Sequence, residues 1–421
     1  MAEATKNCDI EWCKEIPVSW DYKPNKYVMR KIKDVCTRYS GEDILSLTMQ
    51  GVIIRDLNAG GKMPTTFDGY QKVYAGNLLM CLFDYDVTPR CIGLIRNNGL
   101  TSPAYSQFVL NDGYSARYYY YYYLMIDHTK ELLHLAKNLR HSFTEDQIGA
   151  LNVPVPPIDE QRRIADFLDE KCAEIDRLSE DIQKQIDILE EYKKSVITRA
   201  VTKGLNPNAE MKDSGQSYIG SIPEKWEIIR IKDVFKMQSG FTPDSKRTDY
   251  YDDIDGFNWV TIADINKNGL LPEITKNKIS KKYIEAFHPR IAKAGSLLYS
   301  FKLSLGQVAL AKKDIYTNEA IISFSCKEAR NLRFLKYSSS LIEYNANTNI
   351  YGSKILNQQL IGNAHVTFPP VEEQEAIANF LDDFNAKMCN IIEEKSDQLQ
   401  KIDAYKKSII YEYVTGKKRV A

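Results

Sequence analysis

The chain has 421 residues, of which 43% are hydrophobic and 27% are charged, and its formal net charge is zero. This profile is typical of soluble globular proteins with roughly two to four domains. Residues 1–15 are polar, and no apolar run approaches the roughly 20 residues that span a bilayer. We therefore expect no secretory signal and no membrane helix, and we expect a soluble protein located in the cytoplasm.

Residues 1–152 are predicted to form a globular domain of mixed α/β structure. Its clearest element is the tyrosine run 118–123, which aligns with residues 333–338 in the second half of the chain. We expect this run to form a helix that packs against a sheet. The rings could instead offer a platform for base stacking, but packing in the core is the favoured interpretation.

Residues 153–205 are predicted to contain a long helix that begins just after Pro156-Pro157. Apolar residues then recur in heptads, with one series at every seventh residue from Leu168 and a second series that includes Ile164, Leu178 and Tyr192. A seam sustained over so many heptads predicts coiled-coil packing. The predicted seam residues of this helix are Ile164, Leu168, Ile175, Ile182, Leu189 and Val196.

Residues 206–221 are predicted to be a linker, and residues 222–365 a second mixed α/β domain. Alternating residues at 296–300 and 307–311 indicate strands in this domain. Residues 366–421 are predicted to form a second coiled-coil helix in the same register, with Ile377, Phe384, Ile391 and Tyr405 in its second heptad series. The predicted seam residues of this helix are Ile377, Leu381, Met388, Ile402 and Ile409.

An internal repeat relates the two halves of the chain. Residues 153–202 align with residues 366–415 without a gap, and 20 of the 50 aligned residues are identical. Shorter matches precede them, such as IPVSW at 16–20 and IPEKW at 222–226. We therefore expect an α+β fold with pseudo-two-fold symmetry, in which two mixed α/β domains are separated by two long helices that form an antiparallel coiled coil.

Gln161 and Gln374 occupy the last position of PPxxEQ segments at the start of the two predicted helices. The prolines and the acidic residues of these segments suit a helix N-terminus. The glutamines fall on the predicted seams, and two interpretations stay open for them. They either make a buried contact at the helix start or dock a partner subunit.

Charge is distributed in step with the repeat. Residues 16–145 hold 15 Lys and Arg against 12 Asp and Glu, and residues 222–352 hold 20 against 15. The helical segments have the opposite balance, with 8 basic and 12 acidic residues over 158–202 and 5 and 10 over 371–415. Because a phosphate backbone attracts basic surfaces and repels acidic ones, this alternation favours DNA as the partner of the two domains.

Motifs that carry catalysis are not visible in the sequence. It contains no GxxxxGK[ST], GxGxxG or HExxH segment and no NPPY or DPPY run of amino methyltransferases. The eight cysteines form no CxxC pair, and the five histidines do not stand at zinc-ligand spacing from them. We expect reduced, mostly buried thiols, no metal site and no catalytic residue.

Several segments resemble the specificity subunits of type I restriction-modification systems. AVTKGLNPNAEMKDSGQSYIGSIPEKWE (200–227) resembles the join between the two halves of these subunits, and CDIEWCKEIPVSW (8–20) resembles the same motif. In the first domain, SLTMQGVIIRD (46–56) and GLTSPAYSQF (99–108) resemble one group of target-recognition domains. The landmarks of the second domain are SGFTP (239–243), WVTIADI (259–265), LSLGQVAL (303–310), TNEA (317–320) and YGSKILN (351–357).

The resemblance covers nearly the whole chain and implies a non-catalytic, DNA-binding role. Each domain would read one half of a bipartite target in double-stranded DNA, and the helices would set the spacer and dock two methyltransferase subunits. Adenine-N6 methylation and restriction of phage DNA would be carried out by those subunits and by two restriction/translocase subunits. S-adenosylmethionine, ATP and Mg²⁺ would belong to these partners, with no cofactor bound by this chain.

Loops beside the landmarks offer side chains with the paired donors and acceptors that base reading needs. For each of them, a solvent-facing or structural role is the alternative. The DNA-binding candidates are Thr48, Gln50, Arg55 and Arg90 in the first domain, and Ser239, Lys246, Lys302, Ser304, Asn347, Asn349 and Tyr351 in the second.

Two other classes of function compete with this interpretation. A coiled-coil scaffold that presents two protein-binding domains is compatible with the repeat, although the basic domains and the landmarks disfavour it. A free-standing nuclease or methyltransferase with unfamiliar motifs would act on DNA without any partner.

Overall fold

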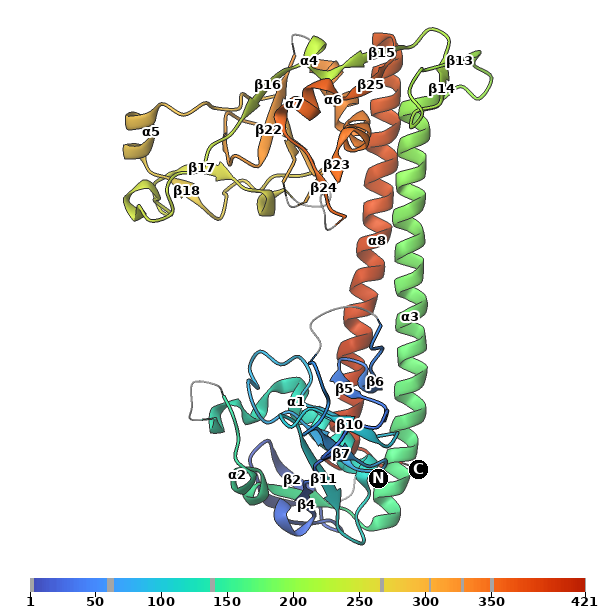
Figure 1. Ribbon diagram of the computed structural model, residues 1–421, viewed down its shortest axis with the longest axis vertical. Coiled ribbons are helices and arrows are strands. Elements are labelled where there is room, and N and C mark those ends of the chain that lie inside the picture. The colour runs from blue at the N-terminus through green and yellow to red at the C-terminus, as the bar shows by residue number, and fades with distance from the viewer. Residues whose placement is uncertain are drawn as a thin grey trace. The chain divides into compact units, whose positions relative to one another are not determined.

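The computed structural model describes residues 4–58, 64–136, 141–265, 269–302, 304–326, 329–348 and 352–420. It divides into two compact units, unit 1 with residues 1–183 and 397–421 and unit 2 with residues 184–396. Each unit holds one globular domain of mixed α/β structure and a part of both long helices, α3 (Ile158–Lys203) and α8 (Val371–Val414) (Figure 1). The predicted fold class is confirmed.

The domain of unit 1 is built around a four-stranded antiparallel sheet. The strand order is β4 (Met29–Ile32), β11 (Ser106–Leu110), β8 (Leu78–Met80) and β9 (Ile92–Leu94). Two-stranded pairs surround it: β1 (Thr5–Ile10) with β2 (Cys13–Pro17), β3 (Asp21–Pro24) with β12 (Asn152–Val155), β5 (Leu45–Thr48) with β6 (Gly51–Ile54), and β7 (Gln71–Val73) with β10 (Gly99–Thr101). The helices of this domain are α1 (Ala116–Thr129) and α2 (Glu145–Ala150).

The tyrosine run lies in α1, which begins where the Ser115 side chain caps the amide of Tyr118. Tyr118, Tyr119 and Tyr122 are fully buried. The hydroxyl of Tyr118 donates to the carbonyl of Val414 at 2.8 Å. Burial raises the pKa of these three phenols well above the ordinary value, so they stay protonated donors. The interpretation of the run as core is confirmed.

The domain of unit 2 repeats this plan. Its four-stranded antiparallel sheet has the order β16 (Lys236–Ser239), β22 (Ile321–Ser325), β19 (Leu297–Ser300) and β20 (Val308–Leu310). The last two strands match those expected from the alternating residues. Pairs β13 (Met211–Asp213) with β14 (Ser221–Pro223) and β15 (Glu227–Arg230) with β25 (His365–Phe368) correspond to β1–β2 and β3–β12 of unit 1. Residues 206–221, predicted as a linker, thus hold β13 and the start of β14.

The remaining elements of unit 2 surround this sheet. Strand β17 (Phe257–Val260) pairs with β18 (Lys278–Ile279) and, in parallel, with β21 (Tyr316–Thr317), and β23 (Asn347–Thr348) pairs with β24 (Lys354–Ile355). The helices are α4 (Ile231–Val234), α5 (Lys281–Phe287), α6 (Ala329–Ser338) and α7 (Gln358–Asn363). In the described part of the chain, no helix combines the length and the apolar character that a bilayer crossing requires.

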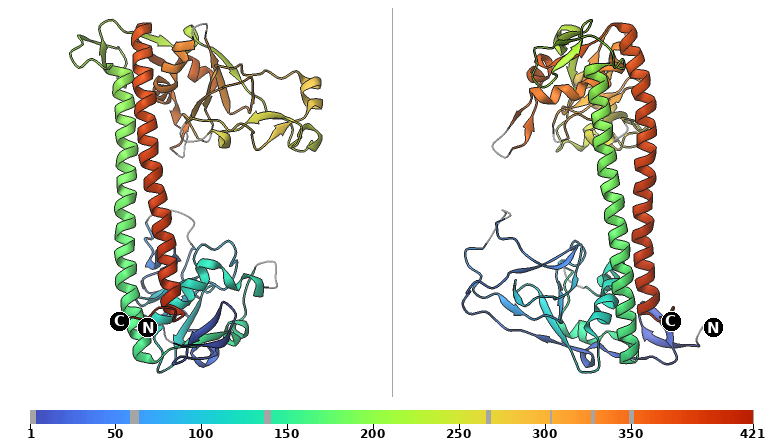
Figure 2. Two further views of the ribbon diagram at one scale, coloured as in Figure 1. Left: turned by 180° about the vertical axis from the view of Figure 1, so that it is seen from behind. Right: turned by 90° about the vertical axis from the view of Figure 1, so that its right-hand side faces the viewer.

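Within each unit, the segments of α3 and α8 lie side by side and antiparallel (Figures 1 and 2). In unit 1, the ring centroids of Phe167 and Tyr413 are 4.4 Å apart, and Lys406 contacts Asp176 further along α3. In unit 2, Lys395 donates to Gln185 at 2.5 Å, and Lys193 contacts Cys389. The partner's number falls as the residue number on α3 rises, which is the antiparallel register.

The first heptad series lies where the sequence places it. Of its predicted seam residues, Leu168, Ile175, Ile182, Leu381 and Ile409 are buried, and Leu189, Val196, Met388 and Ile402 are half-buried.

The second heptad series is confirmed at its first member on each helix, since Ile164 and Ile377 are buried, but it is wrong further along the helices. Leu178 and Tyr192 are 50% and 54% exposed, and Tyr405 is 58% exposed. The inner face instead uses the residue four positions after each member of the first series, which includes Cys172, Ser179 and Ile186 on α3 and Asn385, Ile392 and Leu399 on α8. On a helix, the residues three and four positions after a member of the first series lie on opposite sides of that series. The side that is buried carries several small or polar side chains, so a pattern based on hydrophobicity did not identify it.

A hydrogen-bonded carboxylate joins each domain to its long helix. In unit 1, Asp169 on α3 accepts from Arg117 Nε at 2.7 Å and from the Tyr121 hydroxyl at 2.6 Å. In unit 2, Asp382 on α8, the repeat equivalent of Asp169, accepts from Arg333 at 2.8 Å and from the Tyr337 hydroxyl. These matched contacts align Arg117 with Arg333, so the predicted match of 118–123 with 333–338 is wrong by one residue.

Candidate nucleic-acid interface

A hollow of about 860 Å³ lies in unit 1 between the domain and the long helices. Gln50, Arg90, Arg96 and Tyr120 line it from the domain. The opposite wall is formed by residues of α3 and α8, which include Asp169, Asp176, Glu180 and Lys406. We call this feature the unit 1 hollow. Gln50 and Arg90, two of the DNA-binding candidates, therefore lie at one site.

Arg90 is held at the hollow by the structure on either side of it. Its Nη1 lies 3.4 Å from the hydroxyl of Tyr120, which accepts a hydrogen bond. Burial raises the pKa of Tyr120, although Arg90 acts in the opposite direction. The next residue, Cys91, donates its amide to the buried carboxylate of Asp127 at 2.8 Å, and Lys130 donates to the carbonyl of Thr88 at 2.8 Å. The loop that carries Arg90 is thus fixed at both sides of the arginine.

Gln50 lies at the tip of the β5–β6 hairpin. The Thr48 hydroxyl donates to the carbonyl of Gly51 and accepts from the amide of Gln50, at 3.1 and 3.2 Å. Gly51 has a φ of +98°, which favours glycine at this turn. Thr48 therefore shapes the turn, whereas the side chain of Gln50 is exposed. Arg55 follows β6, where its amide donates to the carbonyl of Ile44, and it does not line the unit 1 hollow.

A repeat-equivalent hollow of about 350 Å³ lies in unit 2. Lys193, Asn385 and Tyr337 line it, and they correspond to Lys406, Cys172 and Tyr121 of the unit 1 hollow. Its other polar residues are Gln307, Lys336, Ser339 and Ser340. We call this feature the unit 2 hollow.

A second cavity of about 730 Å³ shares Gly269 and Lys336 with the unit 2 hollow and extends it to Lys312 and Lys313. Lys312 follows β20 by two residues, as Arg96 follows β9 by two residues. Sequence reasoning missed both. Their shared place after equivalent strands is the signal that could have found them.

The landmarks of the second domain meet at one edge of its sheets. Gly240 donates its amide to the carbonyl of Ile321, and Phe241 donates to the carbonyl of Thr317 at 2.9 Å. A Cβ on Gly240 would lie 2.1 Å from the carbonyl oxygen of Thr317, so this close approach requires glycine. The Trp259 indole donates to the carbonyl of Phe241 at 3.0 Å.

Two of the candidates of the second domain lie at this meeting point. Ser239 ends β16 and pairs with Ile322. The exposed Lys302 lies 3.9 Å from Glu319, and the preceding residue, Phe301, donates its amide to the carbonyl of Ala320. The structure thus brings Ser239 and Lys302 to the same edge.

The other candidates of the second domain are exposed or undescribed. Ser304 follows Lys302 in a turn and is exposed, with its carbonyl accepting from the Ser300 hydroxyl. Lys246 is exposed in the loop after β16, and Asn347 is exposed in β23. Asn349 and Tyr351 lie outside the described residues.

Gln161 and Gln374 are buried at the start of the long helices. The amide nitrogen of Gln161 donates to the carbonyl of Pro156 at 2.8 Å, and its oxygen accepts from the amide of Ser115, which caps α1. Gln374 donates to the carbonyl of Pro369 at 2.8 Å. These contacts are those of a buried junction, and the side chains are not exposed for docking.

The acidic, thiol and imidazole side chains are the groups of this chain that could bind a metal ion. Across the described ranges, no group of three or more His, Cys, Asp or Glu side chains is arranged to hold a metal ion. The cysteines in these ranges are free thiols, and most of them are buried.

Comparison with known proteins identifies the family. The family model "Type I restriction modification DNA specificity domain" matches residues 94–187 and 223–401. The chain is 27% identical over 285 residues to the type I restriction enzyme MjaVIII specificity subunit of Methanocaldococcus jannaschii, which is 64% of this chain and 63% of that protein. It is 24% identical over 276 residues to the EcoBI specificity subunit of Escherichia coli, which is 63% of this chain and 58% of that protein.

The matches thus span about three fifths of the length of these curated relatives. A solved chain described under "Structural basis underlying complex assembly and conformational transition of the type I R-M system" superposes with a TM-score of 0.69 at 14% identity, covering 95% of this chain and 99% of that chain. This likeness shows that the two share a fold. The chain belongs to the family of type I restriction modification DNA specificity domain proteins.

Proposed function

We propose that this chain is the DNA-recognition subunit of a type I restriction-modification enzyme, and that each of its domains reads one half of a bipartite target. The observation that carries the proposal is the pair of repeat-equivalent hollows together with the second cavity of unit 2, which is continuous in its lining with the unit 2 hollow. Basic side chains stand there two residues after equivalent strands, Arg96 in unit 1 and Lys312 in unit 2. Membership of the specificity family and the names of the relatives support it.

The chemistry of the two hollows suits sequence reading. Arginine and glutamine offer paired donors and acceptors to guanine and adenine edges, and lysine and arginine also bind phosphate oxygens. Gln50, Arg90 and Arg96 supply these groups in unit 1, and Gln307 and Lys312 supply them in unit 2. Since the two sets differ in side-chain type, the two halves of the target would differ in sequence.

Methylation and cleavage are assigned, in this proposal, to other subunits. Two methyltransferase subunits would methylate adenine at N6, and two restriction/translocase subunits would cleave. S-adenosylmethionine, ATP and Mg²⁺ would be bound by them, and the whole assembly would act in the cytoplasm, where its DNA substrate lies. The relatives are called specificity subunits, and the solved chain comes from a study of complex assembly, which supports a role within an assembly.

The long helices would set the spacer between the half-sites and dock the methyltransferase subunits. Helices of 46 and 44 residues extend over about 69 and 66 Å at 1.5 Å per residue. Both carry an excess of acidic residues on average, which disfavours contact with phosphates and leaves their outer faces to protein partners.

A domain exchange tests the proposal. Residues 16–145 are replaced by the first domain of another family member, and the variant is expressed with the methyltransferase partner in a host that lacks adenine methylation of its own. Sequencing that detects methyladenine then gives the target. One half of the motif should change and the other half should stay, and exchange of residues 222–352 should do the reverse.

The outcome distinguishes the competing functions. Methylation that is unaffected by either exchange would show that the domains do not read DNA, as expected of a protein-binding scaffold. Methylation by the purified chain alone would show a free-standing enzyme. A change of both halves in either exchange would contradict independent reading.

A further inference from the structure

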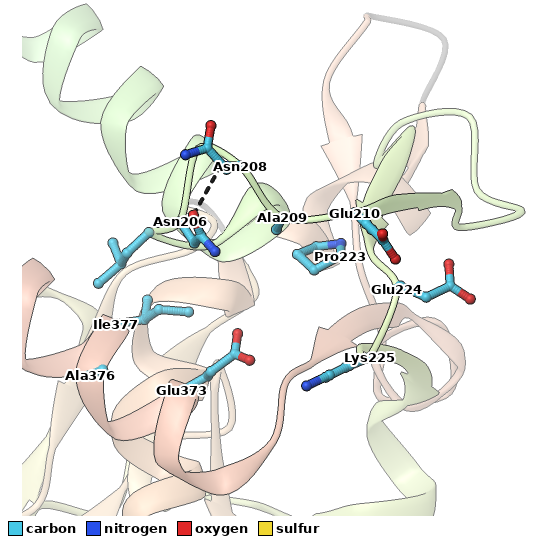
Figure 3. A pocket seen from close by; sticks show the side chains of 11 residues that line it. Asn206, Asn208, Ala209, Glu210, Pro223, Glu224, Lys225, Glu373, Ala376 and Ile377 are labelled. Carbon is cyan, nitrogen blue, oxygen red and sulfur yellow. Dashed lines mark hydrogen bonds between the residues drawn. The ribbon is translucent and has the colours of Figure 1, made fainter.

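A cavity of about 580 Å³ in unit 2 lies outside the hollows described above (Figure 3). Its walls are the turn that follows α3, the base of the β13–β14 hairpin and the first turns of α8. Glu373 and Ile377 face it from α8, opposite Asn206 (Figure 3). We call it the helix-end cavity.

Arg419 occupies the repeat-equivalent place in unit 1. Glu160 corresponds to Glu373, and Ser19 corresponds to Lys225, another residue of the cavity wall. Arg419 lies there, with its Nε 3.4 Å from the Glu160 carboxylate and its Nη2 2.6 Å from the Ser19 hydroxyl. Unit 1 therefore shows which side chain this site accepts, an arginine that neutralises the nearly buried carboxylate of Glu160.

Unit 2 lacks the equivalent arginine. Asn206 stands four residues after Thr202, as Arg419 stands four residues after the matching Thr415. The side-chain oxygen of Asn206 accepts from the backbone amide of Asn208 at 3.0 Å, and this side chain is not hydrogen-bonded to Glu373. The site that holds an arginine in unit 1 is thus an open cavity in unit 2.

The Glu373 carboxylate has no basic partner among the described residues. It accepts a hydrogen bond from the indole nitrogen of Trp226 at 2.7 Å, and no described lysine or arginine nitrogen lies within 4 Å of it. The corresponding indole of Trp20 in unit 1 has no hydrogen-bond partner in the described structure, and Glu160 contacts Arg419 there. The repeat-equivalent carboxylates therefore differ in their partners: Glu160 contacts an arginine and Glu373 does not.

The lining of the helix-end cavity suits such a side chain. Its carboxylates are Glu210, Glu224 and Glu373, against the single ammonium group of Lys225. Leu205, which is 45% exposed, adds apolar surface for the methylene stem of an arginine. The planar guanidinium matches a carboxylate through two parallel hydrogen bonds, which a lysine cannot form.

We propose that the helix-end cavity binds an arginine-bearing basic segment of another protein in the assembled enzyme. A second copy of this chain is the less suitable source, because its own basic tail is already engaged. Lys418 pairs with Glu412 at 3.0 Å, and Arg419 contacts Glu160 and Ser19. The inference rests on the proposed function insofar as the chain acts within an assembled enzyme, but it concerns an interaction surface and is independent of which bases the two domains read.

The probe for the test is a fluorescein-labelled peptide with the sequence of residues 416–421, GKKRVA. Its binding to the full-length chain is followed by fluorescence anisotropy at low ionic strength. Saturable binding is expected, and a peptide with glutamine in place of arginine should bind roughly tenfold more weakly.

Three variants of the chain locate the binding. Glu373→Gln removes the charge but keeps an acceptor for Trp226, and it should weaken binding by roughly tenfold. Glu375→Gln removes the same charge from an exposed position of α8 that does not line the cavity, and it should leave the affinity unchanged. Asn206→Arg supplies in the same chain the residue that unit 1 has, and it should compete with the peptide while Glu373 stays intact.

Equal affinities for the wild type and Glu373→Gln, or no saturation up to millimolar peptide, would overturn the proposal. Self-association of the chain in sedimentation, abolished by Glu373→Gln, would overturn the choice of partner by showing that a second copy fills the cavity.

Discussion

The Nζ atom of Lys406 lies 2.5 Å from Oδ1 of Asp176 in unit 1. The repeat-equivalent pair in unit 2 is Lys193 and Cys389, whose Nζ and Sγ atoms lie 3.2 Å apart. The lysine and its register are the same in both units, although its partner is a carboxylate in one and a thiol in the other. The apolar face of the helices, and not this ion pair, therefore determines their alignment.

The corrected inner face of α3 can be tested with two neighbouring aspartate substitutions. Ile182 is 7% exposed and Leu178 is 50% exposed. Ile182→Asp should lower the free energy of unfolding by about 3–5 kcal/mol, because the new carboxylate loses its hydration without gaining a partner. Leu178→Asp should change it by less than about 1 kcal/mol. Urea unfolding of the full chain measures both, and similar losses would restore the second heptad series that the sequence predicted.

Asp382, the carboxylate that joins the domain of unit 2 to α8, should make the stability of the protein depend on pH. Burial would raise the pKa of Asp382, but hydrogen bonds from Arg333, Tyr337 and Lys336 outweigh it and hold the pKa below its ordinary value. The stabilisation is therefore present above the unfolded pKa of about 3.9 and is lost as the pH falls through the lower folded value. Asp382→Asn should be less stable than the wild type at pH 7, and the difference should shrink as the pH falls below the unfolded pKa of about 3.9.

A neighbouring carboxylate provides the control for this pH dependence. Asp383 lies on the same helix with its side chain 68% exposed and pairs with Lys387 at the surface. Chemical denaturation of Asp383→Asn across the same pH range should follow the wild type closely, since exposed pairs contribute little. A constant difference between wild type and Asp382→Asn at every pH would contradict the linkage.

Under the proposed function, Arg96 and Lys312, which follow equivalent strands, should contribute to the affinity for DNA. Arg96→Ala and Lys312→Ala should each weaken binding of the subunit with its methyltransferase partner to target DNA by roughly 3- to 10-fold. If the residue contacts a phosphate, the slope of log affinity against log salt should fall by about 1. Lys33→Ala, an exposed lysine away from the unit 1 hollow, serves as the control. Unchanged affinity and slope for both variants would remove these residues from the interface.

The close approach at Gly240 predicts a packing defect. In Gly240→Ala the new methyl group would meet the carbonyl oxygens of Thr317 and Asn318 at 2.1 and 2.3 Å. We expect a loss of about 1–3 kcal/mol, because backbone atoms must shift to admit it. Gly149→Ala, in which the nearest atom is 3.5 Å away and the residue is in α2, should be neutral or slightly stabilising. Thermal unfolding compares the two, and equal midpoints would show that the edge adapts freely.

The repeat and the two long helices were determined by the sequence itself. Helix starts at Pro-Pro pairs and heptad spacing are local signals, and a gapless match of 50 residues forces two helices into the same pattern. The first seam series, such as Leu168 and Leu381, follows because one face of each helix is apolar at every seventh residue. Family landmarks likewise lie in continuous segments, so they could be read without a structure.

Only the tertiary structure decided which side of the first seam series is buried between the helices, and which residues far apart in the sequence come into contact. Leu178 is more apolar than Ser179, yet Ser179 lies inward, because burial depends on what packs against the helix and not on hydrophobicity alone. Arg90 and Gln50 come together, and the helix-end cavity is open in unit 2, through contacts between segments far apart in the chain. Sequence spacing carries no information on such contacts, since they are fixed by packing in three dimensions.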